Sequence, residues 1–172
     1  MLENGKASTI NDTSYVLFEM PLNVEPMNLY DVIYEMLQNK LVPILAHPER
    51  YSFVQQDPEL IYDLIQKGVL MQANYGSIIG QYGTKAQMIV KKFLESNMIH
   101  FLGTDCHRQN TVYPKIPQIL AELNELIGEE KLEELTETNP KLALKNKRID
   151  INEPNKIELS LKEKFILKFK KD

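Results

Sequence analysis

Four short apolar runs are spread over the first two thirds of the chain, at residues 15–18, 41–46, 69–74 and 99–104. Each run is bounded by polar or turn-forming residues and contains β-branched members. Short apolar runs with such boundaries are typical of buried strands. The pattern therefore predicts four strands in this part of the chain.

The segments between the runs place apolar residues at helical spacing instead. A first helix is predicted over 26–39, where Pro26 suits the first turn because its missing N–H is not needed there. A second is predicted to begin at Asp57, a candidate N-cap followed by proline, and to end at Gly68. Further helices are predicted at 84–97, 114–127 and 129–136.

Strand and helix alternate three times at intervals of roughly 25–30 residues, which is typical of right-handed βαβ units. We therefore expect an α/β fold with a parallel sheet. Four strands are too few to close a barrel of about eight strands, so the sheet is either open or part of a larger barrel. Residues 1–149 are expected to form the domain, and residues 150–172, rich in Lys and Glu, a charged tail.

Length and charge narrow the class of protein. The chain has 172 residues and a formal net charge of −4, which suits a single domain and disfavours a general nucleic-acid binder. No apolar run approaches the roughly 20 residues of a membrane span, and the first residues lack the apolar stretch of a signal peptide. The single cysteine, Cys106, fits a reducing compartment. We expect a cytoplasmic protein with no nucleic-acid partner and no membrane span.

Potential metal ligands follow three of the predicted strands. Glu19 closes the first strand, His47 follows the second, and Asp105 and His107 follow the fourth. Because the carboxyl ends of parallel strands meet at one edge of a sheet, these side chains are expected to converge. Carboxylates suit Mn²⁺ or Mg²⁺, and imidazoles suit Zn²⁺ or Fe. The sequence therefore predicts a site for divalent metal ions.

The residues beside these ligands suggest phosphate chemistry. Pro48 biases His47 towards an extended backbone, and Arg50 follows closely, where its guanidinium can bind phosphate bidentately. A structural histidine beside a surface arginine is the alternative for this pair. Asp105 and His107 would point to the same side if the strand geometry continued through them.

Cys106 raises a second hypothesis, a cysteine-based tyrosine phosphatase. Such an enzyme needs an arginine to close the loop that begins at the cysteine, and the corresponding position here is Val112. Cys106 is therefore expected to be a small packing residue. His100, early in its strand, is expected to be structural. The loop 75–82, which contains tyrosines at both ends, is expected to pack against the domain, with a role in lining a substrate cleft as the alternative.

Three motifs are specific in combination. They are 44–51 (ILAHPERY), 72–80 (QANYGSIIG) and 103–107 (GTDCH), with Asn139-Pro140 beyond them. Together they resemble the polymerase-and-histidinol-phosphatase (PHP) family. Within it they are similar to the bacterial manganese-dependent tyrosine phosphatases of capsular and extracellular polysaccharide biosynthesis. The resemblance extends from about Lys6 to about Ile149.

This resemblance implies a distorted (β/α)7 barrel of the PHP type, of which the chain would supply only the C-terminal strands and helices. The C-terminal rim of that barrel would hold divalent metal ions, with Mn²⁺ expected before Mg²⁺, Fe or Zn²⁺. Glu19 and His47 would share one ion. Asp105 would ligate a second ion, and His107 a third.

The same resemblance implies a reaction and a substrate. Arg50 would contact the substrate phosphate, and Arg108 is the residue available for a second contact. Water, rather than a protein nucleophile, would attack phosphorus, with Arg50, His47 and Asp105 at the catalytic centre. The implied substrate is phosphotyrosine on a protein, foremost a bacterial tyrosine kinase that controls polysaccharide export.

The chain also departs from the family pattern. The family carries a His-x-His strand end and further ligands before the position of Glu19, whereas the histidines here are 47, 100 and 107. We therefore expect roughly the first third of a family member to be absent. One alternative function is a truncated, non-catalytic fragment. Another is a small-molecule phosphoesterase of the histidinol-phosphatase type, while the acidic charge balance disfavours a nuclease.

An absent N-terminal part would have measurable consequences. The isolated chain should bind divalent ions weakly and hydrolyse little or no p-nitrophenyl phosphate. The outer strands, 15–18 and 99–104, would carry unpaired N–H and C=O groups that can pair with another chain. We therefore expect self-association through these exposed strands.

Overall fold

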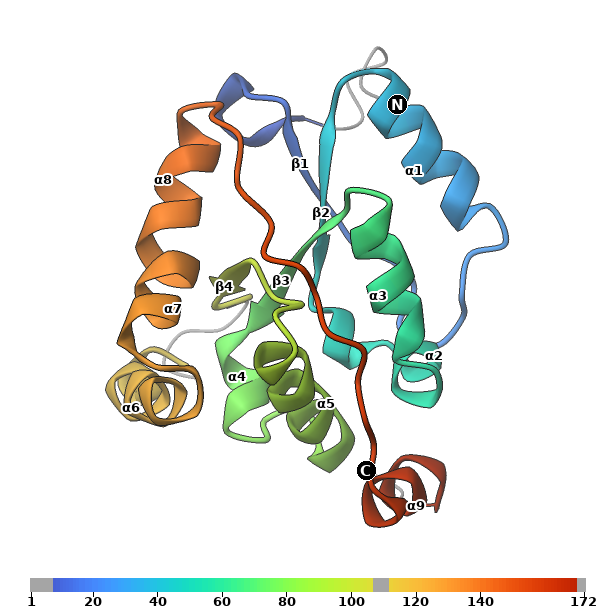
Figure 1. The fold of residues 1–172 in the computed structure, drawn as a ribbon, viewed down its shortest axis with the longest axis vertical. Helices are drawn as coiled ribbons and strands as arrows, with labels where there is room; N and C mark the ends of the chain where they lie inside the picture. The colour runs from blue at the N-terminus through green and yellow to red at the C-terminus, as the bar shows by residue number, and fades with distance from the viewer. Residues whose placement is uncertain (1–7, 107–111, 170–172) are drawn as a thin grey trace.

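A four-stranded parallel sheet forms the centre of the computed structural model, which describes residues 8–106 and 112–169 (Figure 1). The strands lie in the order β1-β2-β3-β4, the same as their order in the chain. Their bounds are Tyr15–Phe18, Val42–Ala46, Leu70–Asn74 and Phe101–Gly103. The prediction of four parallel strands is confirmed, although β4 is shorter than the apolar run that predicted it.

The helices between the strands also match their predicted positions. They are α1 (Leu29–Gln38), α3 (Glu59–Gln66) and α5 (Thr84–Glu95). Helix α1 begins after Pro26, not at it, so the predicted start is too early. Asp57 lies just before α3 as expected, and its Oδ1 accepts a hydrogen bond from the Glu59 N–H at 3.3 Å.

Short helices that the hydrophobic pattern did not predict follow two of the strands. The 3₁₀ turn η3 (Pro48–Arg50) and helix α2 (Ser52–Gln56) come after β2, and helix α4 (Tyr75–Ile78) comes directly after β3. Each is too short to show a helical period in the sequence. They matter because they turn the chain at the carboxyl ends of the strands, where the predicted site residues lie.

After β4 the chain is helical for most of its length. The elements in order are η4 (Tyr113–Lys115), α6 (Ile116–Ile127), α7 (Glu129–Glu133), the π-helix η5 (Glu134–Thr138), α8 (Asn139–Leu144) and α9 (Leu161–Phe169). A further 3₁₀ turn, η2 (Ile10–Asp12), precedes β1. The break at Gly128 between α6 and α7 occurs where the sequence predicts it, at a positive φ of 80°.

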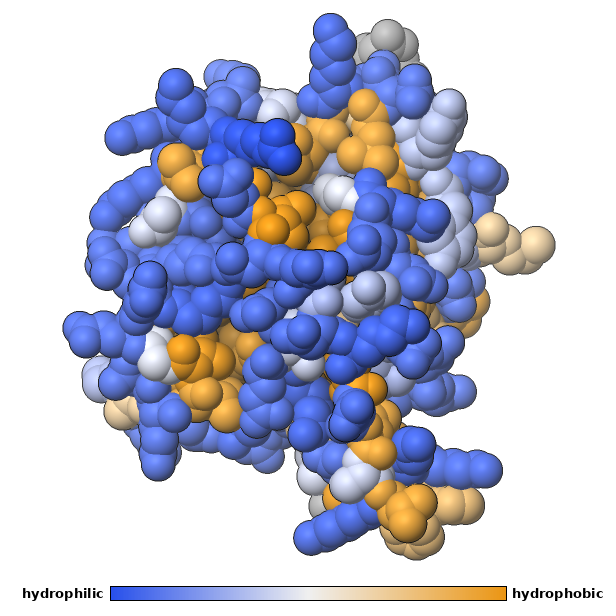
Figure 2. Space-filling view, in the orientation of Figure 1, coloured by the Kyte–Doolittle hydropathy of each residue, from blue (hydrophilic) through white to orange (hydrophobic). Residues whose placement is uncertain are grey.

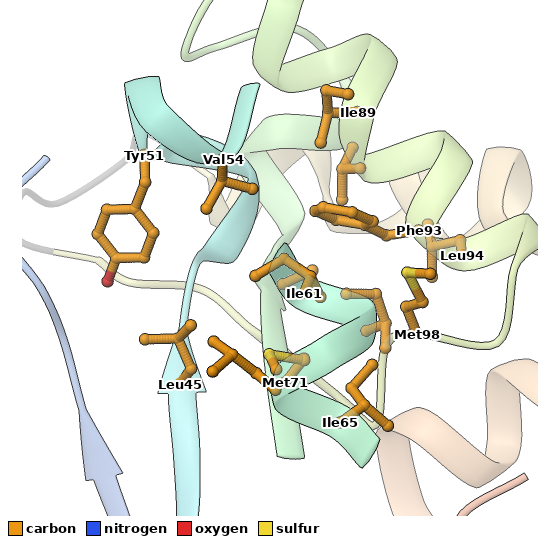
Figure 3. Packing of buried hydrophobic residues seen from close by; sticks show 14 of the residues in the cluster. Leu45, Tyr51, Val54, Ile61, Ile65, Met71, Ile89, Phe93, Leu94 and Met98 are labelled. Carbon is orange, nitrogen blue, oxygen red and sulfur yellow. The ribbon is translucent and has the colours of Figure 1, made fainter. Parts of the chain in front are cut away.

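Adjacent residues of each central strand point into two different cores, as the alternation of a strand requires. Leu45 and Met71 pack with α3 and α5 in the larger core, which Figure 3 shows from close by. Ile44 and Leu70 point to the other face, where Ala143 of α8 covers them. Figure 1 accordingly shows α1 and α3 on one side of the sheet and α8 on the other. With both faces covered, the central strands β2 and β3 are largely buried, which explains their nearly continuous apolar sequences.

The segment after residue 149 packs against the domain and is not wholly a solvated tail. Leu167 of α9 is buried in the larger core, and Glu163 forms an ion pair with Lys92 of α5 at 3.3 Å. Figure 2 shows mostly hydrophilic side chains over the viewed face, with hydrophobic ones exposed at the end where α9 lies. No helix within 8–106 or 112–169 is long and apolar enough to span a bilayer. Strands β1 and β4 are the edges of the described sheet, so self-association through them stays a prediction.

Candidate active site

The described site residues lie at one edge of the sheet. Glu19 follows β1 directly, His47 follows β2, and Asp105 comes shortly after β4. Because the strands are parallel and in register, their carboxyl ends bring these side chains to the same edge, as predicted. Two other predicted residues, His107 and Arg108, lie outside the described residues.

Glu19 and His47 form a contact pair. His47 Nε2 lies 3.2 Å from Glu19 Oε2; the imidazole is almost fully buried and the carboxylate is 75% exposed. Burial, and then the charge of Arg50, lower the pKa of His47 below its ordinary value, against the opposing hydrogen bond with Glu19 and the charge of Asp105. The imidazole is therefore held neutral with a lone pair, which is the form that binds a metal ion.

The backbone at both His47 and Asp105 is left-handed. His47 has a φ of 39° and Asp105 a φ of 45°. The expectation that Pro48 would hold His47 extended is wrong, and so is the premise that the β4 geometry continues through Asp105, because β4 ends at Gly103. Residues other than glycine in this region store strain of about 1–3 kcal/mol, and such strain clusters at functional sites.

Arg50 reaches across the sheet edge to Asp105. Its Nη1 donates to Asp105 Oδ2 at 2.5 Å, and the Asn74 side chain donates to the same oxygen at 2.9 Å. The Arg50 guanidinium carbon lies 4.2 Å from the centre of the Tyr82 ring, a cation–π contact. The Asn74 amide thus holds the Asp105 carboxylate, and the Tyr82 ring contacts the Arg50 guanidinium. These contacts show that Arg50 is only partly exposed, and its role at the site stays a prediction.

Glu49 is a site residue that the sequence interpretation missed. Its side chain is fully buried, and its Oε1 accepts hydrogen bonds from the Asn74 N–H at 3.1 Å and the Ser77 hydroxyl at 2.5 Å. Burial raises the pKa of Glu49 to about 7, with the two hydrogen bonds opposing the shift. Glu49 ties η3 to the start of α4. The sequence signal that could have identified Glu49 was its position between His47 and Arg50, because a third chemically active residue in one short turn is unusual.

Asn74 and Tyr82 were also missed as site residues. Asn74 ends β3 and has a fully buried side chain, whose Nδ2 donates to Asp105 while its Oδ1 has no hydrogen-bond partner among the described residues. Tyr82 lies in the loop before α5, for which loop packing was the favoured interpretation. The pKa of Tyr82 is raised by burial, while nearby Arg50 and a hydrogen bond with the Asn74 side chain lower it.

The Glu19–His47 pair fits a divalent ion in one respect. Two donors bound to one ion at about 2.1 Å lie roughly 3 Å apart, and the Glu19 and His47 donor atoms are 3.2 Å apart. Among the described residues, however, no group of three or more His, Cys, Asp and Glu side chains gathers closely enough to hold an ion. The described donors therefore offer a partial site, open to a further ligand.

His100 has the contacts of a structural residue, as the sequence predicts. The Nδ1 of His100 accepts a hydrogen bond from the Met71 N–H at 3.1 Å, and its carbonyl accepts one from Asn139 Nδ2 at 2.9 Å. These contacts join β4 to β3 and to α8 at the end of the sheet away from the site. Cys106 is half-buried and is in no disulfide, and the packing role expected of it stays a prediction.

Comparison with known proteins identifies similar chains. The family model described as "Capsular polysaccharide synthesis, CpsB/CapC" matches residues 1–145. The chain is 31% identical over 150 residues to the tyrosine-protein phosphatase YwqE of Bacillus subtilis, a match that covers 87% of this chain and 59% of that protein. It is 28% identical over 158 residues to the tyrosine-protein phosphatase CpsB of Streptococcus agalactiae, covering 85% and 63%.

A solved structure has the same fold. It comes from crystal structures of YwqE from Bacillus subtilis and CpsB from Streptococcus pneumoniae, described as metal-dependent tyrosine phosphatases. The TM-score is 0.84 at 29% identity, and the match covers 92% of this chain and 64% of the other. The chain therefore spans less than two thirds of the length of the relatives that it matches.

Proposed function

This chain belongs to the CpsB/CapC family of capsular polysaccharide synthesis, and we propose that it acts in the metal-dependent hydrolysis of phosphotyrosine on proteins. The observation that carries the proposal is that two potential metal donors and a positively charged side chain lie at the same edge of the sheet. Glu19 and His47 supply neighbouring oxygen and nitrogen donors, and Arg50 presents a guanidinium held by Asp105 and Tyr82. A phosphoryl group needs both kinds of partner.

The finer ligand set follows the family resemblance. We propose that Glu19, His47, Asp105 and His107 hold divalent ions, with Mn²⁺ foremost, at the rim of a partial PHP barrel. Such ions, when bound, supply a Lewis acid that activates water and neutralises phosphoryl charge. The burial that keeps His47 neutral makes its lone pair available for this role. Arg108 is proposed as a second phosphate contact beside Arg50.

The chain's own residues would orient the substrate. Arg50 would bind two phosphoryl oxygens through its planar fork. Asp105 fixes one guanidinium nitrogen and Asn74 fixes Asp105, so the fork starts from a defined position. Glu49 anchors the η3 turn, which follows His47 directly and ends at Arg50. This arrangement lowers the entropy lost when the phosphate is positioned.

The biological setting belongs to the same proposal. We propose that the substrate is a phosphotyrosine protein, namely a bacterial tyrosine kinase, and that hydrolysis regulates capsular or extracellular polysaccharide synthesis. A cytoplasmic location is part of the proposal, since the single cysteine suits a reducing compartment. The similarity to tyrosine-protein phosphatases supports this substrate over histidinol phosphate.

The test compares two proteins on three substrates. The first protein is the 172-residue chain, and the second is a fusion that adds the part of YwqE that the chain does not match. Release of phosphate is measured from a phosphotyrosine peptide, from histidinol phosphate and from a phosphoserine peptide, with Mn²⁺ and after chelation. We expect chelator-sensitive release from phosphotyrosine by the fusion, in which more ligands are present, and little or none by the 172-residue chain. Equal release without metal, or a preference for histidinol phosphate, would contradict the proposal.

The fragment hypothesis has one observation in its favour. The described residues form a two-donor site and not a cluster of three, so metal binding by the chain alone should be weak. Calorimetric titration of the chain with Mn²⁺ separates the two functions. Tight binding of more than one ion would exclude the fragment hypothesis, and binding that appears only in the fusion would support it.

A further inference from the structure

We propose that Tyr82 is a positioning residue that holds the Arg50 guanidinium ready to receive a phosphoryl group, an inference that rests on the proposed function. The guanidinium carbon of Arg50 lies over the Tyr82 ring at 4.2 Å from its centre. An arginine above an aromatic face is attracted by the negative face of the ring. The ring thereby supports the guanidinium through a contact that uses none of its N–H donors as a hydrogen bond.

Arg50 needs such support because its other described contact holds only one atom. Asp105 accepts from Nη1, and a single hydrogen bond leaves a planar group free to rotate about that bond. A long side chain loses on the order of 2 kcal/mol of rotamer entropy when it is fixed. The Tyr82 ring restricts the remaining rotation before a ligand arrives. Preorganisation of this kind strengthens binding without adding a contact to the ligand.

The local sequence explains how Tyr82 reaches this place. A Cβ at Gly76 would lie 2.9 Å from Tyr82 Cε2, so the ring can lie against α4 only because residue 76 has no side chain. The loop is closed by a hydrogen bond from the Gln81 N–H to the Gly76 carbonyl at 2.9 Å. Gly80 and Gly83, at φ values of 75° and 95°, turn the chain on either side of the ring.

The proposal separates the ring of Tyr82 from its hydroxyl. Tyr82→Phe keeps the aromatic face, so it should preserve the position of Arg50. Tyr82→Leu removes the face at similar volume, so Arg50 should become mobile. Gly76→Ala leaves Tyr82 in the sequence and displaces its ring, and it should act in the same direction as Tyr82→Leu. Tyr34→Leu on the exposed face of α1 is the matched control.

Two measurements on the 172-residue chain test this. The chain contains three arginines, at 50, 108 and 148, so the NMR signal of the Arg50 Nε–H group can be assigned by substitution. That signal should be shifted by the Tyr82 ring current in the unaltered chain, in Tyr82→Phe and in Tyr34→Leu, and unshifted in Tyr82→Leu. Calorimetric binding of phenyl phosphate should weaken about threefold to thirtyfold in Tyr82→Leu, and markedly less in Tyr82→Phe, which loses only the hydrogen bond with Asn74. Thermal unfolding of each variant shows that it is folded.

The outcomes distinguish this inference from the function beneath it. If neither the unaltered chain nor the fusion described above binds phenyl phosphate, with or without Mn²⁺, the proposed function fails and this inference fails with it. If the chain binds phenyl phosphate and Tyr82→Leu binds it equally well, only this inference is overturned. A ring-current shift that survives in Tyr82→Leu would also overturn it. Equal weakening by Tyr82→Phe and Tyr82→Leu would assign the effect to the hydroxyl and contradict the role of the ring.

Discussion

The two ends of the sheet each bury a histidine, and the two imidazoles lie in opposite chemical settings. At the amino end of β4, His100 accepts a hydrogen bond from the Met71 N–H and serves the neighbouring strand. At the carboxyl end of β2, His47 faces the exposed carboxylate of Glu19. Burial lowers the pKa of both, that of His100 to about 3. The same residue type is therefore a structural acceptor at one end and a candidate ligand at the other.

The backbone conformation and its hydrogen bonding also differ between the two histidines. His100 pairs with its neighbouring strand, with its N–H donating to the Met71 carbonyl at 2.9 Å. His47 is left-handed at a φ of 39°, and its Nδ1 has no hydrogen-bond partner in the described part of the chain. The Nε2 of His100 also has no hydrogen-bond partner there, so what sets His47 apart is its left-handed backbone and its exposed carboxylate partner. The comparison teaches that burial alone does not separate a structural histidine from a functional one.

The largest expected effect is on hydrolysis at the carboxyl end. In the fusion described above, His47→Ala and Asp105→Ala should each lower phosphotyrosine hydrolysis by roughly 10²–10³-fold, the cost of removing a group that stabilises transition-state charge. His100→Gln should leave the rate per folded molecule nearly unchanged. Steady-state kinetics on all three variants provide the measurement. A comparable loss in His100→Gln would break the distinction between the two ends.

The next effect is on stability as a function of pH. The folded pKa of His100 is lowered from 6.5 to about 3, so the unfolded chain binds more protons in that window and stability is lost as pH falls from 6.5 to 3. The folded pKa of Glu49 is raised from 4.5 to about 7, so stability is lost as pH rises from 4.5 to 7. The His100 shift corresponds to about 5 kcal/mol and the Glu49 shift to about 3 kcal/mol at most, and between pH 4.5 and 6.5 the two effects oppose each other.

Variants of the two groups should reveal these opposing slopes. In chelator-treated protein, His100→Gln should leave a stability that falls as pH rises through 4.5–7, and Glu49→Gln one that rises with pH through 3–6.5. Urea unfolding across this pH range is the measurement. Identical profiles for the two variants would show that one of these groups does not titrate as its burial requires.

A third effect concerns stability at neutral pH. His100→Ala removes the acceptor of a buried N–H and leaves a cavity, and it should lower the free energy of unfolding by roughly 3 kcal/mol. His47→Ala should cost less, because the hydrogen-bond partner that the imidazole loses, the Glu19 carboxylate, is mostly exposed to solvent. Chemical denaturation with matched m-values measures both. If His47→Ala proves the more destabilising, the carboxyl end contributes more to the fold than the comparison allows.

The smallest expected effect belongs to Cys106, which lies at the functional end without a proposed role in chemistry. Cys106→Ser should leave hydrolysis unchanged and alter the free energy of unfolding by less than about 1 kcal/mol. Kinetics and denaturation of this variant are the measurements. Loss of activity would point to a thiolate nucleophile and overturn the metal-dependent mechanism.

The repeating elements could be predicted from the sequence because their signals are local. Each strand is a short apolar run, and α1, α3 and α5 are amphipathic over two turns or more. The short elements η3, α2 and α4 could not, because they hold fewer residues than a helical period needs to show itself. The left-handed backbone of His47 was likewise out of reach, since the local influence of Pro48 favours an extended residue.

Sequence alone determined the candidates for chemistry. Glu19, His47, Arg50 and Asp105 are recognisable because each lies at or shortly after the end of a predicted strand. Tertiary structure decided how they are held. Only the folded chain places Tyr82 over Arg50, buries Glu49 against Ser77, and separates the setting of His47 from that of His100. These relations join residues far apart in the sequence through distance, burial and hydrogen bonding. Such quantities depend on the packing of several elements, and no single segment of the sequence contains them.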